Sequence, residues 1–274
     1  MHIAITGGSG RIGHAVIVLA LQQGHSVTSI DQVLPQQSPP AGVRVAQLDM
    51  TNYTELAAAL VDCDAMVHLA AIPTPTLAPE HVVHNNNVTS SYNAMLAAIN
   101  TGMRRICQAS SVNATGAAYS RWPHFDYMPL DEQHPSYNED PYSLSKWICE
   151  QQADSLARRY KDVHIASLRF HWIVPNRDFA MQHGQEFSAV LPKQLWGYTN
   201  IQAAAQACLL SLTADFTGHE VFYIVAPKTM MTTPSQELKR QYFPDVALRS
   251  DLNNTTGFFN CAKAERLLGW QHDQ

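Results

Sequence analysis

The amino-acid sequence predicts an α/β fold in which helices cover both faces of a doubly wound parallel sheet. The first half of the chain alternates short strands that are apolar throughout with amphipathic helices, and strands of that kind are buried on both faces, as in parallel sheets. A glycine cluster joins the first strand to the first helix. Because parallel strands are joined by right-handed crossovers, a doubly wound sheet is the expected arrangement.

Composition narrows the class of protein further. The 274 residues are 46% hydrophobic and 15% charged, which excludes a disordered chain. A net charge of −5 does not favour binding to nucleic acid or to an anionic membrane. The five cysteines are scattered, and the apolar runs fall short of the roughly 20 residues that span a bilayer. With a strand expected from residue 2 in place of a signal peptide, we expect a cytoplasmic protein.

The elements of the first half follow in a regular order. Strands are expected over residues 2–6, 26–30, 43–48, 65–70 and 104–109, and helices over 11–23, 54–61 and 87–101. The second half is less regular, with a long loop over 116–140 and no clear period over 174–195. It contains strands over 164–170 and 221–225 and helices over 141–160, 201–212, 234–242 and 262–268.

These elements suggest one domain over residues 1–274 with two functional parts. Residues 1 to about 170 form a Rossmann core, and residues 171–274 form mostly a small substrate-binding lobe, interleaved with the last strands. No repeat or linker separates the two parts.

The glycine cluster has the spacing of a dinucleotide-binding loop. Gly7, Gly10 and Gly13 lie between the first strand and the first helix, where glycines permit a tight turn and a close approach to a pyrophosphate. Asp31 then ends the second strand. A carboxylate there accepts hydrogen bonds from ribose hydroxyls and repels a 2′-phosphate, so the sequence predicts NAD rather than NADP.

Candidate catalytic residues lie farther along the chain. Tyr142 and Lys146 are four residues apart on the helix expected over 141–160, so they share one face. A neighbouring ammonium, together with the positive charge of a nicotinamide, favours the phenolate of a tyrosine and prepares it for acid–base work. Ser110 and Ser111 come at the end of the fifth strand, at the edge where parallel sheets present their ligands. We expect the Ser111 hydroxyl to hold a substrate oxygen against the phenol, and Ser110 to be structural.

The whole pattern resembles the extended short-chain dehydrogenase/reductases, the NAD-dependent epimerase/dehydratase family. The shared motifs are TGGSGRIG, LDM, HLAA, ASS, YSLSK and LLGW, in the family's order. The resemblance implies that Tyr142 is the catalytic acid/base, that Lys146 supports it and binds the nicotinamide ribose, and that Ser111 polarises the substrate. It also implies the following cofactor-binding residues: Gly7, Gly10, Arg11, Ile12, Gly13, Asp31, Asp49, Met50, Leu69, Ala70, Ala71 and Asn87, together with Tyr142 and Lys146.

Three departures from the family pattern concern the substrate. Residues 114–116 read Ala-Thr-Gly in place of Val-Tyr-Gly, and Trp172 stands where sugar-nucleotide epimerases carry an asparagine. The chain also ends at residue 274, which leaves little room for a lobe that grips a nucleoside diphosphate. These features resemble the compact uronate dehydrogenases. Asn113 and Ser111 are then expected at the substrate, and Arg177 is either a clamp for a substrate carboxylate or a solvated loop residue.

The preferred function is an NAD-dependent oxidoreductase that moves a hydride between a small polar substrate, such as a sugar or sugar acid, and the nicotinamide. A sugar or nucleotide-sugar epimerase or dehydratase with transient hydride transfer is the second reading, and a non-catalytic NAD-binding regulatory protein is the third. The aromatic loop over 117–140 is either a lid over the pocket or a self-packed flap or dimer surface. By analogy with relatives, the helices over 87–101 and 141–160 are expected to form a homodimer contact, and no metal site is expected.

Overall fold

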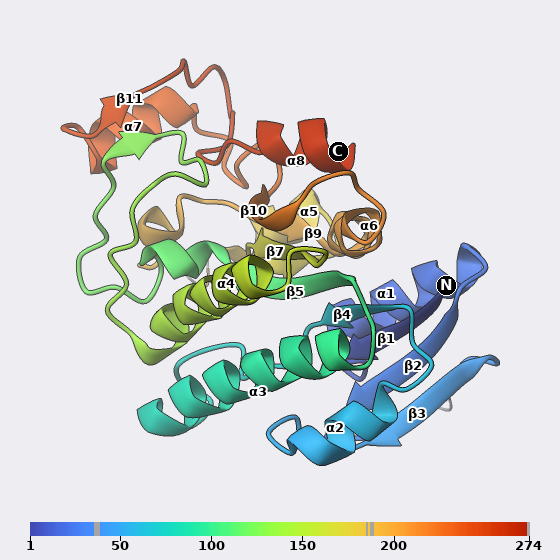
Figure 1. The fold of residues 1–274 in the computed structure, drawn as a ribbon. Helices are drawn as coiled ribbons and strands as arrows, with labels where there is room; N and C mark the ends of the chain where they lie inside the picture. The colour runs from blue at the N-terminus through green and yellow to red at the C-terminus, as the bar shows by residue number, and fades with distance from the viewer. Residues whose placement is uncertain (36–38, 185, 187–188, 273–274) are drawn as a thin grey trace.

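Seven parallel strands form one central sheet in the computed structural model, which describes residues 1–35, 39–184, 186 and 189–272. The strand order across the sheet is β10-β7-β5-β4-β1-β2-β3, so the chain winds outward from β1 in both directions (Figure 1). This order confirms the predicted doubly wound fold. The strands are β1 (His2–Thr6), β2 (Ser26–Asp31), β3 (Val43–Gln47), β4 (Ala65–His68), β5 (Arg105–Ser111), β7 (His164–Phe170) and β10 (Gly218–Ile224).

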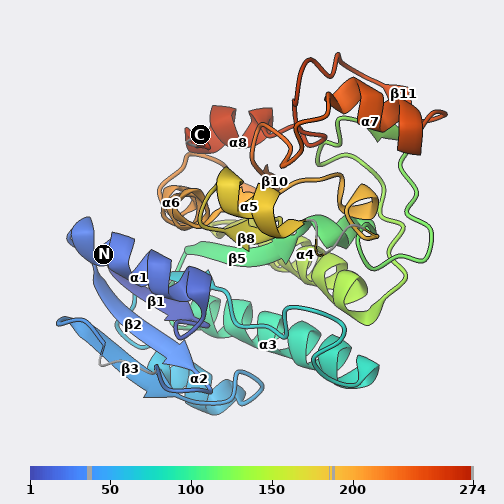
Figure 2. The same ribbon diagram turned by 180° about the vertical axis from the view of Figure 1, so that it is seen from behind.

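Helices cover both faces of the sheet, as Figures 1 and 2 show. One face packs against α1 (Arg11–Gln22), α6 (Ile201–Ser211) and α8 (Ala262–Leu268), and the other against α2 (Tyr53–Ala59), α3 (Glu80–Asn100) and α4 (Pro141–Arg159). Alternation along β1 explains the two cores. Ile3 and Ile5 are buried in the first core, while Ala4 between them is buried in the second.

A third core holds the lobe together on the β10 side of the sheet. The lobe contains α5 (Arg177–Gly184), α7 (Ser235–Tyr242), the paired strands β6 (Tyr127–Met128) and β11 (Ala247–Leu248), and the paired strands β8 (Ile173–Val174) and β9 (Thr199–Asn200). Phe258 and Tyr223 lie fully buried within it. Two short 3-10 helices, η1 (Val112–Thr115) and η3 (Pro192–Gln194), connect the lobe to the carboxyl edge of the sheet.

Several boundaries differ from the sequence-based expectations. Helix α3 begins at Glu80 rather than at residue 87, because its first turns bury Val83. Strand β5 continues through Ser110 and Ser111, since both residues still pair with β7. Residues 116–140 include β6, and residues 174–195 include α5 and η3. Within the described residues, none of the helices combines the length and the hydropathy that crossing a membrane requires.

Candidate active site

A cavity of about 680 Å³ lies at the carboxyl ends of β1, β2, β4, β5 and β7. That is the edge where ligands bind in doubly wound sheets, and the volume suits a bound cofactor with a small substrate. The cavity brings together residues that are far apart in the sequence. The predicted residues among its lining are Gly7, Gly10, Arg11, Ile12, Gly13, Asp31, Asp49, Met50, Leu69, Ala70, Ala71, Ser111, Asn113, Tyr142 and Lys146.

The glycine loop has no room for side chains at its critical positions. A Cβ on Gly13 would lie 2.2 Å from the Gly7 carbonyl oxygen, and one on Gly7 would lie 2.8 Å from the Ala70 nitrogen. Gly7 also has a φ of +71°, which favours glycine. Gly10 is the N-cap of α1 and, having no side chain, leaves the first amides of the helix open toward the cavity. This arrangement fits a pyrophosphate, because a helix N-terminus attracts anions.

Gly8 is a loop glycine that the spacing argument did not single out. A Cβ there would lie 2.1 Å from the Ser29 hydroxyl oxygen on β2. It packs against the sheet, whereas Gly7, Gly10 and Gly13 line the cavity. The adjacent pair Gly7 and Gly8 was the sequence feature that could have indicated a second position without room for a side chain.

Asp31 presents a fixed carboxylate at the end of β2. One of its oxygens accepts from the Ser9 amide at 3.0 Å and the other from the Val33 amide at 3.1 Å. Two backbone amides therefore hold the carboxylate while it lines the cavity. Asp49 is held in a similar way by the Thr51 amide and hydroxyl, each at 2.8 Å. Both positions fit the adenosine end of a dinucleotide.

Thr6 organises the segment that follows β4. Its hydroxyl oxygen accepts from the amides of Leu69 and Ala70 at 3.2 and 3.3 Å, and the hydroxyl donates to Nδ1 of His68 at 2.7 Å. Burial lowers the pKa of His68 to about 3, and the charge of Lys146 acts in the same direction. His68 is therefore a neutral structural residue, as expected for a histidine at a strand end.

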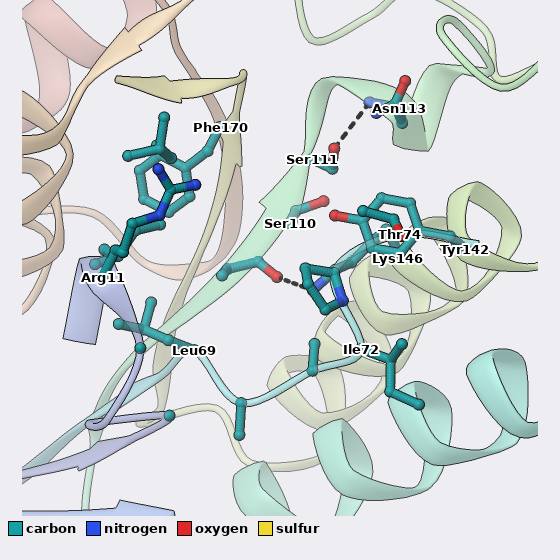
Figure 3. Close-up of a pocket in the computed structure, with 18 of the residues that line it drawn as sticks. Arg11, Leu69, Ile72, Thr74, Ser110, Ser111, Asn113, Tyr142, Lys146 and Phe170 are labelled. Carbon is teal, nitrogen blue, oxygen red and sulfur yellow. Dashed lines mark hydrogen bonds between the residues drawn. The ribbon is translucent and has the colours of Figure 1, made fainter. Parts of the chain in front are cut away.

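Tyr142, Lys146 and Ser111 converge at one end of the cavity (Figure 3). Asp140 caps α4, accepting from the amides of Tyr142 and Ser143 at 3.0 and 2.9 Å, and this sets the phenol on the first turn. The Lys146 ammonium donates to the Ala109 carbonyl at 2.7 Å and lies 5.9 Å from the centre of the phenol ring. Ser111 contacts the Tyr142 phenol, and its hydroxyl oxygen accepts from the Asn113 amide at 3.1 Å.

The pKa of Tyr142 differs in direction from the sequence-based expectation. Burial raises it well above the ordinary value of a phenol, while the hydrogen bond with Ser111 acts in the opposite direction. Burial also lowers the pKa of Lys146. In the protein without coenzyme, burying the phenol therefore has a larger effect on its pKa than Lys146. The expectation combined the charge of Lys146 with that of a bound nicotinamide, and it stays a prediction for the complex.

Asn87 does not line the cavity. Its amide oxygen accepts from the Ile72 amide at 2.8 Å, and its nitrogen donates to the Ile72 carbonyl and the Ser145 hydroxyl at 3.0 and 3.1 Å. The side chain thus joins α3 to α4 and to the segment after β4. These contacts fit the structural role that the resemblance also implies for this helix asparagine, rather than a contact with the cofactor, while its neighbours Asn86 and Ser90 line the cavity.

Arg177 also lies outside the cavity lining. Its guanidinium donates to the carbonyls of Thr229 and Met231, both at 2.9 Å, and thereby ties α5 to the segment after β10. Neither alternative describes Arg177 in this structure, because it is a half-buried helix residue outside the cavity lining rather than a carboxylate clamp or a solvated loop residue. Its guanidinium is engaged by backbone carbonyls that come from a distant part of the sequence.

Other lining residues carry weaker sequence signals. Phe170 is the last residue of β7, and His171 and Trp172 follow it, so their position at a strand end was a signal. Tyr119 belongs to the predicted aromatic loop, where composition was the signal. Thr74, Leu191 and Gln194 come from segments without any motif. Elsewhere in the part of the chain that the structure describes, no three His, Cys, Asp or Glu side chains gather as metal ligands.

Two sugar dehydrogenases of Haloferax volcanii are among the relatives of this chain. An NAD-dependent glucose-6-phosphate dehydrogenase is 27% identical over 178 residues, which cover 61% of this chain and 65% of the relative. An L-arabinose 1-dehydrogenase is 29% identical over 181 residues, which cover 63% of this chain and 67% of the relative. The match to the first of these therefore spans slightly less than two thirds of that protein's length.

Solved structures share the fold over the full chain. The UDP-glucose 4-epimerase of Thermotoga maritima, solved with UDP-glucose, has a TM-score of 0.74 at 16% identity and is covered over 94% of its length. A uronate dehydrogenase has a TM-score of 0.71 at 20% identity and is covered over 82% of its length. Both comparisons cover 100% of this chain.

The family assignment comes from the sequence profile of the NAD dependent epimerase/dehydratase family, which matches residues 3–195. This segment includes the glycine loop, Asp31 and the Ser111, Tyr142 and Lys146 group. The match confirms the expected cofactor, NAD. The chain belongs to the NAD-dependent epimerase/dehydratase family.

Proposed function

We propose that this protein is an NAD-dependent oxidoreductase that transfers a hydride between a small, uncharged polar substrate and the nicotinamide. The observation that carries the proposal is the convergence of Ser111, Tyr142 and Lys146 at one end of a cavity whose other end fits a dinucleotide. A phenol with an alcohol beside it and an ammonium 5.9 Å from the centre of its ring provides an acid–base group together with the means to orient it.

In the proposed oxidation, Tyr142 acts as the phenolate, having released its own proton to solvent when the coenzyme binds. Its oxygen takes the proton of the substrate hydroxyl while the hydride on the same substrate carbon leaves for the nicotinamide. The Ser111 hydroxyl, already in contact with that phenol, donates to the same substrate oxygen as it becomes a carbonyl oxygen. Lys146 stabilises the charge on the phenol and is held in place by the Ala109 carbonyl. Bound NAD supplies the hydride acceptor and a positive charge that opposes the effect of burial on the phenol.

The lining around Tyr142 supports a neutral substrate. Asn113, Tyr119 and Gln194 provide uncharged polar groups, while Trp172 and Leu191 provide apolar surface. Among the described lining residues the cationic side chains are those of Arg11, at the glycine loop, and Lys146, which is hydrogen-bonded to a carbonyl. Because Arg177 lies outside the lining, a neutral sugar fits better than a sugar acid. The similarity to an L-arabinose dehydrogenase supports this choice.

Further parts of the proposal concern organisation. Residues 1 to about 170 are proposed to bind NAD, and the lobe formed mostly by residues 171–274 to close over the substrate. We also propose a homodimer through α3 and α4, which expose Tyr92, Leu144 and Trp147. All five cysteines are free thiols, which supports the proposed cytoplasmic location.

The test is a panel of neutral aldoses, uronic acids and hydroxy acids with NAD, read by NADH absorbance. We expect NADH to accumulate with at least one neutral aldose. Tyr142→Phe is expected to reduce turnover by about 10²- to 10⁴-fold while NAD binding, measured by calorimetry, is retained. Tyr160→Phe, the same substitution at the far end of α4, is the matched control and is expected to leave turnover unchanged.

Two other outcomes would contradict the proposal. Conversion of a sugar without net NADH would identify an epimerase or dehydratase. NAD binding with no turnover in the panel, and no effect of Tyr142→Phe on any measured property, would support a non-catalytic NAD-binding protein.

A further inference from the structure

Three consecutive residues at the end of β5 contact three residues of α4 that are spaced four apart. Ser111 contacts Tyr142, the Ala109 carbonyl accepts from Lys146 at 2.7 Å, and the Ser110 hydroxyl donates to Oε1 of Glu150 at 2.6 Å. Since positions i, i+4 and i+8 share one face of a helix, α4 faces the strand end through all three contacts. Two of the contacts involve the candidate catalytic residues, and the third involves Glu150.

Glu150 is held from its other side by Arg169 of β7. The guanidinium donates through Nε to Oε1 at 2.9 Å and through Nη2 to Oε2 at 2.8 Å, a bidentate arrangement. Arg169 is the register partner of Ser110 on the neighbouring strand. Its third nitrogen donates to the Tyr223 hydroxyl of β10 at 3.2 Å. One carboxylate therefore links α4 to three adjacent strands, directly to β5 and β7 and through Arg169 to β10.

Stability alone does not explain a buried ion pair at this place. Glu150 and Arg169 are 2% and 5% exposed, and removing two charges from water costs about as much as their attraction returns. An apolar pair of similar volume would hold the same elements together equally well. A bidentate pair differs from apolar packing because its two parallel hydrogen bonds between Glu150 and Arg169 fix direction as well as distance.

We propose that Glu150 and Arg169 form a positioning pair that fixes Ser110 and Lys146, and through them Ser111 and Tyr142, in the geometry needed for proton transfer. Glu150 lies one helical turn beyond Lys146, and Ser110 directly precedes Ser111. The inference rests on the proposed function, since it assigns these two residues a task within that site. Neither residue lines the cavity, so both act through their neighbours.

The pair also sets the charge next to Lys146. The Glu150 carboxylate raises the pKa of Lys146, against the effect of burial. Arg169 balances that carboxylate, so the pair adds little net charge beneath the site. Removing one partner changes this balance, whereas removing both preserves it and removes the directional contacts.

The experiment separates positioning from stability by comparing single and double variants. Glu150→Gln and Arg169→Met each leave one buried group without its partner and are expected to lower the unfolding midpoint. The double variant Glu150→Leu with Arg169→Met is expected to regain most of that stability. Its kcat is nevertheless expected to stay about 10- to 100-fold below that of the wild-type protein, with KM little changed, because the reacting groups are misplaced.

Two further variants test whether the site depends on the direction of the Arg169 hydrogen bonds or only on the charge of Arg169. Arg169→Lys keeps the charge but loses the bidentate contact, so its kcat is also expected to fall about tenfold. Tyr223→Phe removes only the hydroxyl beyond Arg169 and is the matched control, with kcat expected within about twofold of wild type.

A readout independent of turnover is the ¹³Cζ resonance of Tyr142 in tyrosine-labelled protein, assigned by its loss in Tyr142→Phe. We expect this resonance to shift, and its alkaline titration midpoint to move, in the double variant but not in Tyr223→Phe. An unchanged resonance and midpoint in a stable double variant would overturn the proposal, as would a wild-type kcat. If the wild-type protein turns over no substrate, the proposed function fails, and the resonance still decides whether the pair positions Tyr142.

Discussion

Two carboxylates of this molecule differ in what their oxygens can still accept. Both oxygens of Asp31 accept from backbone amides, yet the group lines the cavity and each oxygen can accept a further hydrogen bond there. Both oxygens of Glu150 accept from Arg169, and one also accepts from Ser110, beneath the surface of the cavity. Residue type is therefore less informative than the partners, which distinguish a group that binds a ligand from one that orients its neighbours.

A first prediction at the residue scale concerns the choice of coenzyme. Replacing Asp31 by Ser removes the charge that would repel a 2′-phosphate, so the preference for NAD over NADP is expected to fall at least about tenfold. Dissociation constants for both coenzymes, measured by calorimetry, check this without a substrate. Asp49→Asn, at the other carboxylate that lines this end of the cavity, is the comparison: it is expected to change the binding of NAD and NADP alike and to leave their ratio unchanged. Equal binding of NAD and NADP by the wild-type protein would contradict the role of Asp31.

At the scale of elements, the turn between β1 and α1 is held by close contacts between backbone atoms. The Gly7 amide donates to the Ile30 carbonyl at 2.8 Å and the Gly10 amide to the Gly7 carbonyl at 3.0 Å, so the loop is joined to β2 and to itself. Because Gly8 and Gly13 have no side chains, α1 packs directly against the loop. The same contacts that place the helix N-terminus at the cavity therefore leave little tolerance for an added methyl group.

Gly13→Ala is expected to destabilise this element by about 1–3 kcal/mol and to weaken NAD binding. The new Cβ would lie 2.2 Å from the Gly7 carbonyl oxygen, which forces loop and helix apart. Urea denaturation and calorimetry measure the two effects. Gly10→Ala is a milder control, because its Cβ would be 3.2 Å from the same oxygen and its φ of −77° suits alanine. Equal stability of Gly13→Ala and the wild-type protein would contradict the steric argument.

At the scale of the whole molecule, two buried histidines link stability to pH. His171 donates to the Gln194 carbonyl at 2.8 Å and accepts from the Trp172 amide at 2.6 Å, so its neutral form is fully hydrogen-bonded. Burial lowers its pKa to about 4, and that of His68 to about 3. Both residues are neutral in the folded protein over a pH range in which an unfolded chain would protonate them.

The free energy of unfolding is therefore expected to fall as the pH decreases from about 6.5 to about 4, because the unfolded chain binds more protons in this range. The loss attributable to His171 reaches on the order of 3 kcal/mol at the acid end. Urea denaturation at several pH values measures it. His171→Gln is expected to flatten the curve, and an equal slope in wild type and variant would contradict the assignment.

Assembly is the second prediction at this scale. If α3 and α4 form the proposed dimer contact, Trp147→Glu is expected to convert the dimer into a particle of 30.4 kDa, since a charge would be buried at the interface. Analytical ultracentrifugation measures the mass. Trp122→Glu, at a tryptophan that is 77% exposed on the loop, is the matched control. A wild-type protein of 30.4 kDa at all concentrations would contradict the dimer.

The sequence alone was sufficient for the sheet, the order of its helices, the glycine loop, and the grouping of Tyr142 with Lys146. Each of these depends on spacing within one element or between neighbours in the chain, where geometry follows directly from residue type. The location of the site at the strand ends was also predictable, because all parallel strands present their carboxyl ends at one edge of the sheet, where ligands bind.

Tertiary structure alone decided the partners of Asn87, Arg177 and Glu150. Asn87 bonds to Ile72 and Ser145, Arg177 to carbonyls beyond β10, and Glu150 to Ser110 and Arg169. Most of these partners come from elements far away in the sequence, and no local pattern records which of them will be nearest after folding. Burial, which raises the pKa of Tyr142, likewise depends on packing by the surrounding elements. Local spacing therefore specifies which groups can act, and packing specifies which of them face the ligand.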